Sequence, residues 1–204
     1  MRKHAALGGL ALSCLAVLLA MGMAVTLTAC GGGDSIKLSD SVPSGFRSRK
    51  VDDMRVAYPD TWDAKESSGS LDADSPDGGA SLSVLHCRAS TIEDMPALDI
   101  YKSKSLDHDV DKRVESAHAK GTKVKRVAKG TDGPAVIYRY ELSGKTDAGT
   151  TIHGYWQYTF SGKGYYIVMV TAPKKDFASH KDQMLDILNS EKLSHPKKPQ
   201  RLDD

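Results

Sequence analysis

The residues of this chain that could bind a partner begin with a basic stretch at positions 118–129. Its cations could contact anionic lipid headgroups or cell-wall polymers, because each lysine near an anionic surface contributes about 1 kcal/mol. The alternative is an edge strand whose lysines prevent pairing with a second sheet. We favour the edge strand, since the charge of the chain is otherwise balanced. The basic candidates are Lys120, Lys123, Lys125 and Arg126.

A second group of candidates lies in an aromatic segment of the chain. Alternate side chains of a strand share one face, so Trp156, Tyr158 and Phe160 lie together, and we interpret them as core. His153 and Tyr155 lie on the opposite face, which holds a ligand or partner or packs beneath a helix. Packing is the favoured interpretation, because large aromatic side chains are mostly buried.

No pattern in the sequence matches a catalytic or metal-binding motif. Gly144–Thr146 resembles the end of a phosphate-binding loop, but Arg139 stands where the first glycine is required. The run Asp107–Asp111 resembles a calcium loop, but Lys112 and His118 replace the glycine and glutamate that the loop needs. The sequence contains no cysteine pairs or histidine pairs at zinc-binding spacing. We therefore expect no catalytic residues, no metal and no cofactor.

The first thirty residues predict export and lipid attachment. Arg2 and Lys3 precede a long uncharged apolar run, as in a secretory signal sequence. The run ends in Leu27-Thr28-Ala29-Cys30, which resembles the lipobox of bacterial lipoproteins. The resemblance implies removal of residues 1–29, a lipid on the Cys30 sulfur, and an anchor at the outer face of the cytoplasmic membrane. A plain signal peptide or an uncleaved anchor is the alternative.

Removal of this segment changes what the composition implies. The chain has 28 basic and 26 acidic residues, and loss of Arg2 and Lys3 leaves 26 of each. A neutral mature chain argues against a dedicated nucleic-acid-binding protein, which would carry a basic excess. Beside Cys30, the mature chain keeps only Cys87, so we expect no internal disulfide and interpret Cys87 as a small buried apolar residue.

The remaining residues predict one α+β domain over 45–193, between a flexible linker over 30–44 and a disordered tail over 194–204. Strands followed by helices, further strands and a final helix are typical of a mostly antiparallel sheet covered by helices. The expected strands span 54–58, 69–74, 80–87, 135–142, 151–160 and 164–171, and the last of these is apolar on both faces. The expected helices span 91–106, about 110–117 and 175–190.

One local pattern indicates a family. The segment Tyr58-Pro59-Asp60-Thr61-Trp62 closes the first expected strand, and its Tyr-Pro pair followed by Trp resembles the PsbP-like superfamily, in particular the LpqN-type lipoproteins of actinobacteria. The resemblance extends over residues 45–193. It implies an αβα sandwich with a central antiparallel sheet, and a role as an accessory factor or cargo-binding module. It carries no catalytic residue onto this chain.

The sequence thus predicts a lipid-anchored, extracytoplasmic binding or accessory module. Its expected partners are the membrane lipid at the anchor and an envelope protein or anionic envelope polymer. The alternative is a small envelope hydrolase or a hydrophobic-ligand carrier whose site is assembled from dispersed residues. A deep cleft with converging His, Asp or Ser side chains would favour the alternative, and a flat sheet face with exposed Tyr or Lys would favour the module.

Overall fold

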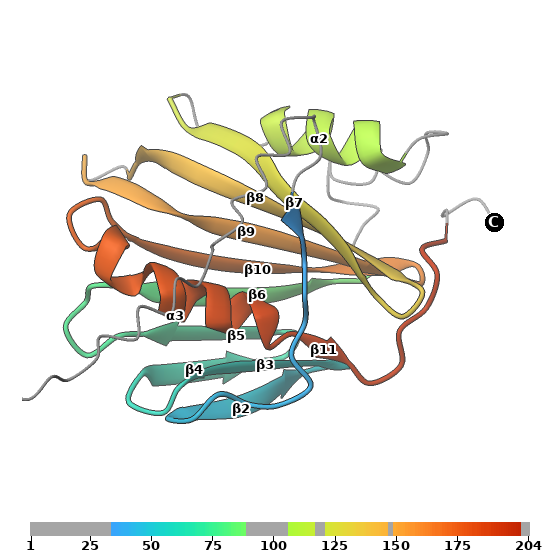
Figure 1. The fold of residues 1–204 in the computed structure, drawn as a ribbon, viewed down its shortest axis with the longest axis horizontal. Helices are drawn as coiled ribbons and strands as arrows, with labels where there is room; N and C mark the ends of the chain where they lie inside the picture. Colours follow the sequence, from blue (N-terminus) through green and yellow to red (C-terminus); the bar gives the residue numbers. More distant parts are fainter. Residues whose placement is uncertain (1–33, 89–105, 117–120, 147–148, 201–204) are drawn as a thin grey trace, which may run out of the picture. The chain divides into compact units, whose positions relative to one another are not determined.

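The computed structural model describes residues 34–88, 106–116, 121–146 and 149–200. In these ranges the chain forms a large sheet, a small sheet and two helices that cover opposite faces of the large sheet (Figure 1). This is the α+β sandwich that the sequence predicts. Within the same ranges, no helix combines the length and the apolar character needed to cross a membrane.

The large sheet has the strand order β1-β7-β8-β9-β10-β6-β5-β4. Strand β1 pairs with β7 in parallel, and all other neighbours in this sheet are antiparallel. Strand β10 lies between β9 and β6, which confirms the central position that its apolar pattern predicts. The strands are β1 (Asp34–Ser35), β4 (Asp63–Ser67), β5 (Ser70–Asp74), β6 (Ser81–Cys87), β7 (Lys123–Asp132), β8 (Ala135–Lys145), β9 (Thr151–Ser161) and β10 (Gly164–Pro173).

The small sheet and the C-terminal helix share one face of the large sheet. The small sheet has the order β11 (Lys192–Leu193), β3 (Met54–Pro59) and β2 (Phe46–Val51). Helix α3 (Phe177–Asn189) buries Met184, Ile187 and Leu188 in the same apolar core as alternate residues of β3, β6 and β10. The Ser190 hydroxyl accepts a hydrogen bond from the Ala57 backbone N–H at 2.7 Å, which joins the end of α3 to β3.

Helix α2 (Leu106–Ser116) covers the other face of the large sheet. Its buried Val110 and Val114 pack among the aromatic side chains of β8, β9 and β10. Tyr158 and Phe160 belong to this cluster and Trp156 packs against it, so the predicted aromatic core face is confirmed. The helix expected over 91–106 lies almost entirely outside the described residues.

The hairpin between β5 and β6 shows how the local sequence sets the register. Asp74 pairs with Ser81, as the turn sequence between them predicts. Within the turn, one Asp77 carboxylate oxygen accepts hydrogen bonds from the Ser75 hydroxyl at 2.7 Å and the Gly79 N–H at 2.9 Å. These bonds hold the pKa of Asp77 below its ordinary value. Strands β2 and β4 were not expected from the sequence, whereas β7 lies where the basic stretch was interpreted as an edge strand.

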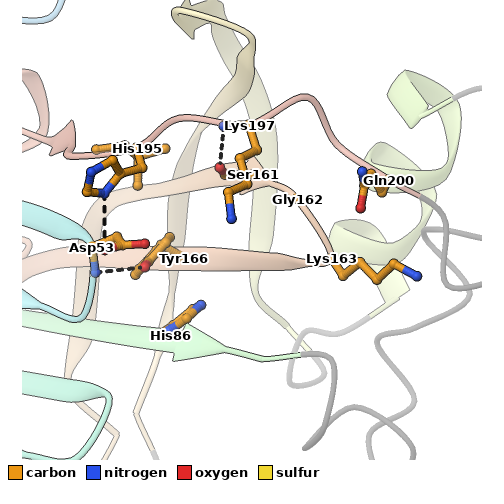
Figure 2. Close-up of a pocket in the computed structure, with 10 residues that line it drawn as sticks. Asp53, His86, Ser161, Gly162, Lys163, Tyr166, His195, Lys197 and Gln200 are labelled. Atoms are coloured by element: carbon orange, nitrogen blue, oxygen red, sulfur yellow. Dashed lines mark hydrogen bonds and ion pairs between the residues drawn. The ribbon is translucent and has the colours of Figure 1, made fainter.

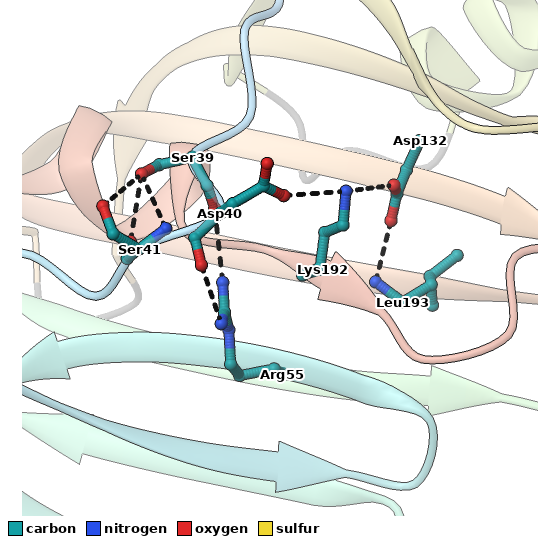
Figure 3. Close-up of polar contacts among 7 residues, drawn as sticks. All are labelled: Ser39, Asp40, Ser41, Arg55, Asp132, Lys192 and Leu193. Atoms are coloured by element: carbon teal, nitrogen blue, oxygen red, sulfur yellow. Dashed lines mark hydrogen bonds and ion pairs between the residues drawn. The ribbon is translucent and has the colours of Figure 1, made fainter.

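The domain begins earlier than residue 45. Where the sequence predicts a flexible linker, β1 pairs with β7, and Ile36 is buried beside Ala128 and Ile137. Lys192 bridges the carboxylates of Asp40 and Asp132 at 3.2 Å and 3.0 Å (Figure 3). The prediction of a linker is therefore wrong for residues 34–41. Ile36 is the buried side chain of this polar segment, and the β1–β7 pairing, the partly buried Leu38 and the Lys192 ion pair to Asp40 supply further contacts.

The C-terminal tail also differs from its prediction. Ser194 donates its N–H to the Asp53 carbonyl at 2.8 Å, and Gln200 donates its N–H to the Gly162 carbonyl at 2.8 Å. Residues 194–200 thus follow the domain surface as an ordered segment. The composition of this segment does not predict that order, because backbone hydrogen bonds make part of its contacts and the segment has no periodic apolar pattern.

Candidate functional site

The structure brings some of the sequence candidates together and separates others. Cys30 and Lys120 lie outside the described residues. Lys123 and Lys125 are exposed at the start of β7, and His153 is half-buried near the start of β9. Strand β8 lies between them.

Two lysines and a histidine face the same shallow depression. The strand register pairs Lys123 with Ser143, and Ser143 with His153, so these side chains project from one face of the sheet. In the same way, Lys125 pairs with Glu141. Together these five residues border an open depression of about 220 Å³, which we call the lysine groove. The groove combines two ammonium groups with one carboxylate, and its local charge is positive.

Tyr155, in contrast, belongs to the core. Its side chain is buried, and its ring centroid lies 5.8 Å from that of Phe177, the first residue of α3. Burial raises the pKa of the Tyr155 hydroxyl. Tyr155 therefore packs beneath a helix, the interpretation favoured from the sequence, while His153, with its ring 5.4 Å from Phe177, lies at the border of the groove.

Arg126 and Lys129 face the opposite side of the sheet from the groove. Arg126 forms an ion pair with Asp111 of α2 at 3.1 Å, and Lys129 forms one with Asp107 at 2.8 Å. Burial acts to raise the pKa of Asp107, but hydrogen bonds from Lys129 and Tyr138 outweigh it and leave that pKa lowered. The basic stretch is therefore divided, and only its first part contributes to the groove.

The position of β7 also fits the edge-strand interpretation. β1 pairs only with Ala128 and Lys129, so along residues 123–127 no described strand pairs with the outer side of β7. The register of β7 against β8 shifts between Arg126 and Ala128. Lysines and such irregularities both disfavour the addition of a further strand.

A larger depression lies at the opposite end of β9 and β10, and the sequence does not predict it. It has a volume of about 320 Å³ and forms where the C-terminal segment crosses the β9–β10 turn (Figure 2). We call it the C-terminal pocket. Its polar lining includes Asp53, His86, Lys163, Tyr166, His195 and Lys197.

The floor of the C-terminal pocket is a stacked pair of rings. The His86 imidazole lies parallel to the Tyr166 ring, with centroids 4.1 Å apart. His86 also hydrogen bonds through Nδ1 to the Asp52 carboxylate, whose other oxygen accepts a bond from Arg88 at 2.6 Å. The Arg88 and His86 bonds hold the pKa of Asp52 below its ordinary value. Burial raises the pKa of Tyr166 to about 12, and the hydroxyl accepts the Asp53 N–H at 3.2 Å.

The C-terminal pocket contains His, Asp and Ser side chains, the residue types that form a catalytic triad, but their geometry does not activate the serine. The Ser161 hydroxyl accepts a hydrogen bond from the Lys197 N–H at 2.9 Å, and the His86 imidazole is bonded to Asp52 instead. His195 lies 3.8 Å from the Asp53 carboxylate. An activated serine needs a base within hydrogen-bonding reach of its hydroxyl, and neither histidine makes that contact. The arrangement is suited to holding a polar ligand.

The described ranges contain no cluster of side chains that could bind a metal ion. No three His, Cys, Asp or Glu side chains there lie close enough together to hold an ion. Cys87 is buried, and burial raises the pKa of its thiol.

No family model and no curated protein matches this chain. Its structure is similar to cyanobacterial PsbP from Synechocystis sp. PCC 6803, with a TM-score of 0.47 and 17% identity, over 82% of this chain and 98% of that one. It is also similar to LpqN of Mycobacterium tuberculosis, a protein involved in cell envelope biogenesis, with a TM-score of 0.44 and 12% identity, over 70% and 83%. The Ran-binding protein Mog1p of Saccharomyces cerevisiae has a TM-score of 0.42 and 10% identity, over 76% and 97%. The likeness concerns the fold alone.

Proposed function

We propose that this chain is a lipid-anchored, extracytoplasmic module that binds a protein partner of the cell envelope through the lysine groove. It positions that partner and carries out no covalent chemistry of its own. One observation carries the proposal: Lys123 and Lys125 are exposed side by side on the outer part of the sheet, next to an open depression bordered by His153.

The mixed charge of the groove favours a protein over a polymer. Glu141 projects from the same face as the two lysines and pairs in register with Lys125. A uniformly anionic polymer would bring negative charge against Glu141 as well as against the lysines. A protein segment can place an acidic group at the lysines and a hydrogen-bond donor at Glu141, and such complementarity gives specificity.

Recognition at the groove uses side chains rather than backbone pairing. The lysines and the irregular register of β7 disfavour the addition of a partner strand, as described above. The depression offers ammonium groups, a carboxylate, a hydroxyl and an imidazole within one surface. These groups suit an acidic, polar segment of a folded partner.

The lipobox supports a place at the membrane. If Cys30 carries the lipid, only Gly31, Gly32 and Gly33 separate it from β1. This tether is much shorter than the linker of residues 30–44 expected from the sequence. A module held this closely meets partners that lie in, or next to, the outer face of the membrane.

The test is in-cell crosslinking of the full-length chain followed by mass spectrometry. The double variant Lys123→Glu/Lys125→Glu should lose the specific partner that the unchanged chain recovers. The matched control is Lys50→Glu/Lys65→Glu, which changes the net charge equally at exposed positions of β2 and β4 and should recover the partner normally.

Two results would contradict the proposal. One is equal recovery of the partner by the groove variant and the control. The other is the absence of any specific protein, combined with binding of the unchanged chain to anionic vesicles or wall polymer. Thermal unfolding of both variants shows whether each is folded.

A further inference from the structure

We infer that the C-terminal pocket is a second binding site, and that it takes the phosphate group of a small phosphorylated molecule. This inference goes beyond the proposed function and does not depend on it. His153 borders the lysine groove and Ser161 lines the C-terminal pocket, eight residues further along β9. At about 3.3 Å per residue, the two places are roughly 26 Å apart.

The charges around the C-terminal pocket favour an anion. Lys163 and Lys197 contribute ammonium groups, and His195 contributes an imidazole. The carboxylate that faces the pocket is Asp53, which is largely exposed and lies 3.8 Å from His195. The neighbouring Asp52 is already matched by Arg88 and His86. Positive charge therefore exceeds negative charge among the described groups at this place.

Neutral hydrogen-bond donors add to the positive charge. The Tyr166 hydroxyl accepts the Asp53 N–H, and its own proton is available to an anion. The Gln200 side-chain amide also lines the pocket. Anions in proteins are held by such combinations of charge-assisted and neutral hydrogen bonds.

The pocket is built in advance rather than formed by loose side chains. Its floor is the stacked pair His86 and Tyr166, and both of these rings lie on strands of the large sheet. Its other wall is the C-terminal segment, held by backbone donors of Lys197 and Gln200 (Figure 2). The Lys197 side chain also packs over Gly162, since a Cβ placed there would lie 3.5 Å from its Cδ. Preorganised donors bind more tightly because less side-chain entropy is lost.

The arrangement of the donors favours phosphate over carboxylate. Lysine ammonium groups bind phosphate as point charges, without the planar fork by which an arginine contacts either anion through two hydrogen bonds. The pocket lining contains two lysines and no arginine. The donors also come from the sheet floor, from the β9–β10 turn and from the tail (Figure 2), which suits an anion with oxygens directed to several sides.

The size of the pocket indicates that the phosphate is attached to something larger. Its volume of about 320 Å³ corresponds to roughly ten water molecules at about 30 Å³ each. A single phosphate ion would leave part of this space to water. The remaining space suits a small polar group esterified to the phosphate.

The test is a titration of the full-length chain in detergent solution with inorganic phosphate, followed through backbone amide signals by NMR. We expect saturable chemical-shift changes at the β9–β10 turn and the C-terminal segment, with a dissociation constant of about 1 mM or lower. Glycerol 3-phosphate should bind at least as tightly. The double variant Lys163→Ala/Lys197→Ala should bind about tenfold or more weakly.

A matched control separates this site from the lysine groove. Lys123→Ala/Lys125→Ala removes the same charge elsewhere and should leave the phosphate shifts unchanged. Tyr166→Phe keeps the ring that stacks on His86 and should weaken binding through the lost hydroxyl alone. The proposal is overturned by the absence of saturable shifts, by equal shifts in the Lys163/Lys197 variant, or by acetate binding as well as phosphate. Each of these results leaves the crosslinking test of the groove unaffected.

Discussion

At the scale of single residues, Glu191 has a strongly raised pKa among the carboxyl groups of the described residues. It is fully buried between α3 and β11, where one of its oxygens accepts a hydrogen bond from the Thr159 hydroxyl at 3.0 Å. No described residue hydrogen bonds to its other oxygen. Burial raises its pKa from 4.5 to about 8, although the neighbouring Gln157 amide, the Arg139 guanidinium and the Thr159 hydroxyl oppose part of this shift. Glu191 is therefore mostly protonated in the folded state at neutral pH.

This pKa shift predicts a pH dependence of stability with a definite sign. The folded state binds the Glu191 proton more tightly than the unfolded state, so the gain in stability is complete below 4.5 and is lost as the pH rises through about 8. We expect Glu191→Gln to remove this pH dependence, which amounts to at most about 1.4 kcal/mol per pH unit. Above the raised pKa, the variant should be more stable than the unchanged chain. Urea unfolding across this pH range measures both effects.

Glu141→Gln is the control for this prediction. Glu141 is exposed on β8, so its replacement should leave the slope of stability against pH as it is. An unchanged slope in Glu191→Gln would contradict the assignment of the pH dependence to the buried carboxyl group.

At the scale of elements, the contact between β9 and β10 depends on a glycine. Gly154 pairs in register with Thr171, and the two strands approach closely at this point. A Cβ at Gly154 would lie 2.1 Å from the Val170 carbonyl oxygen and 2.9 Å from the Thr171 Cα. Backbone atoms of a central strand cannot move aside without breaking the ladder.

We therefore expect Gly154→Ala to lower the free energy of unfolding by about 1–3 kcal/mol or more. Thermal unfolding followed by circular dichroism is the measurement. Thr151→Ala, at the start of the same strand, is the control and should change stability by about 0.5 kcal/mol or less. Equal stability of the two variants would show that the strands accommodate a methyl group at this position.

At the scale of the whole molecule, both ends of the described chain close over the domain. The segment before β2 is tied down at Arg55, which donates hydrogen bonds to the Ser39 and Asp40 carbonyls (Figure 3). The C-terminal segment is tied down at the β9–β10 turn. The domain is thus larger than the sequence predicts, and the stretch that would connect it to a lipid is correspondingly shorter.

The lipid anchor itself is a prediction about the whole molecule. We expect the mature chain in membranes to begin at Cys30 and to carry a lipid mass on that residue, as intact-mass analysis would show. Cys30→Ser should remove the modification, because serine offers no sulfur for lipid attachment. An unmodified Cys30 thiol in the membrane fraction, or a mature chain that begins elsewhere, would contradict the lipoprotein interpretation.

Patterns within single segments determined much of this fold. The two faces of β9, the hairpin around Asp77 and the inward side of α2 at Val110 and Val114 all follow from periodicity or turn chemistry. The side chains at the lysine groove could also be named in part, because Lys123, Lys125 and His153 are recognisable as basic or polar strand residues. Their convergence follows only from the sheet order β7-β8-β9.

The C-terminal pocket and the ordered ends were decided by tertiary structure alone. The Asp53 N–H and the Tyr166 hydroxyl that meet in the pocket are 113 positions apart, and Ala57 and Ser190 are 133 apart. Periodicity reports which side of an element is apolar, but not which distant element will lie against it. Which distant elements pack together depends on the combined packing of both sheets and α3. The same packing orders residues 34–41 and 194–200, although neither segment has a periodic apolar pattern.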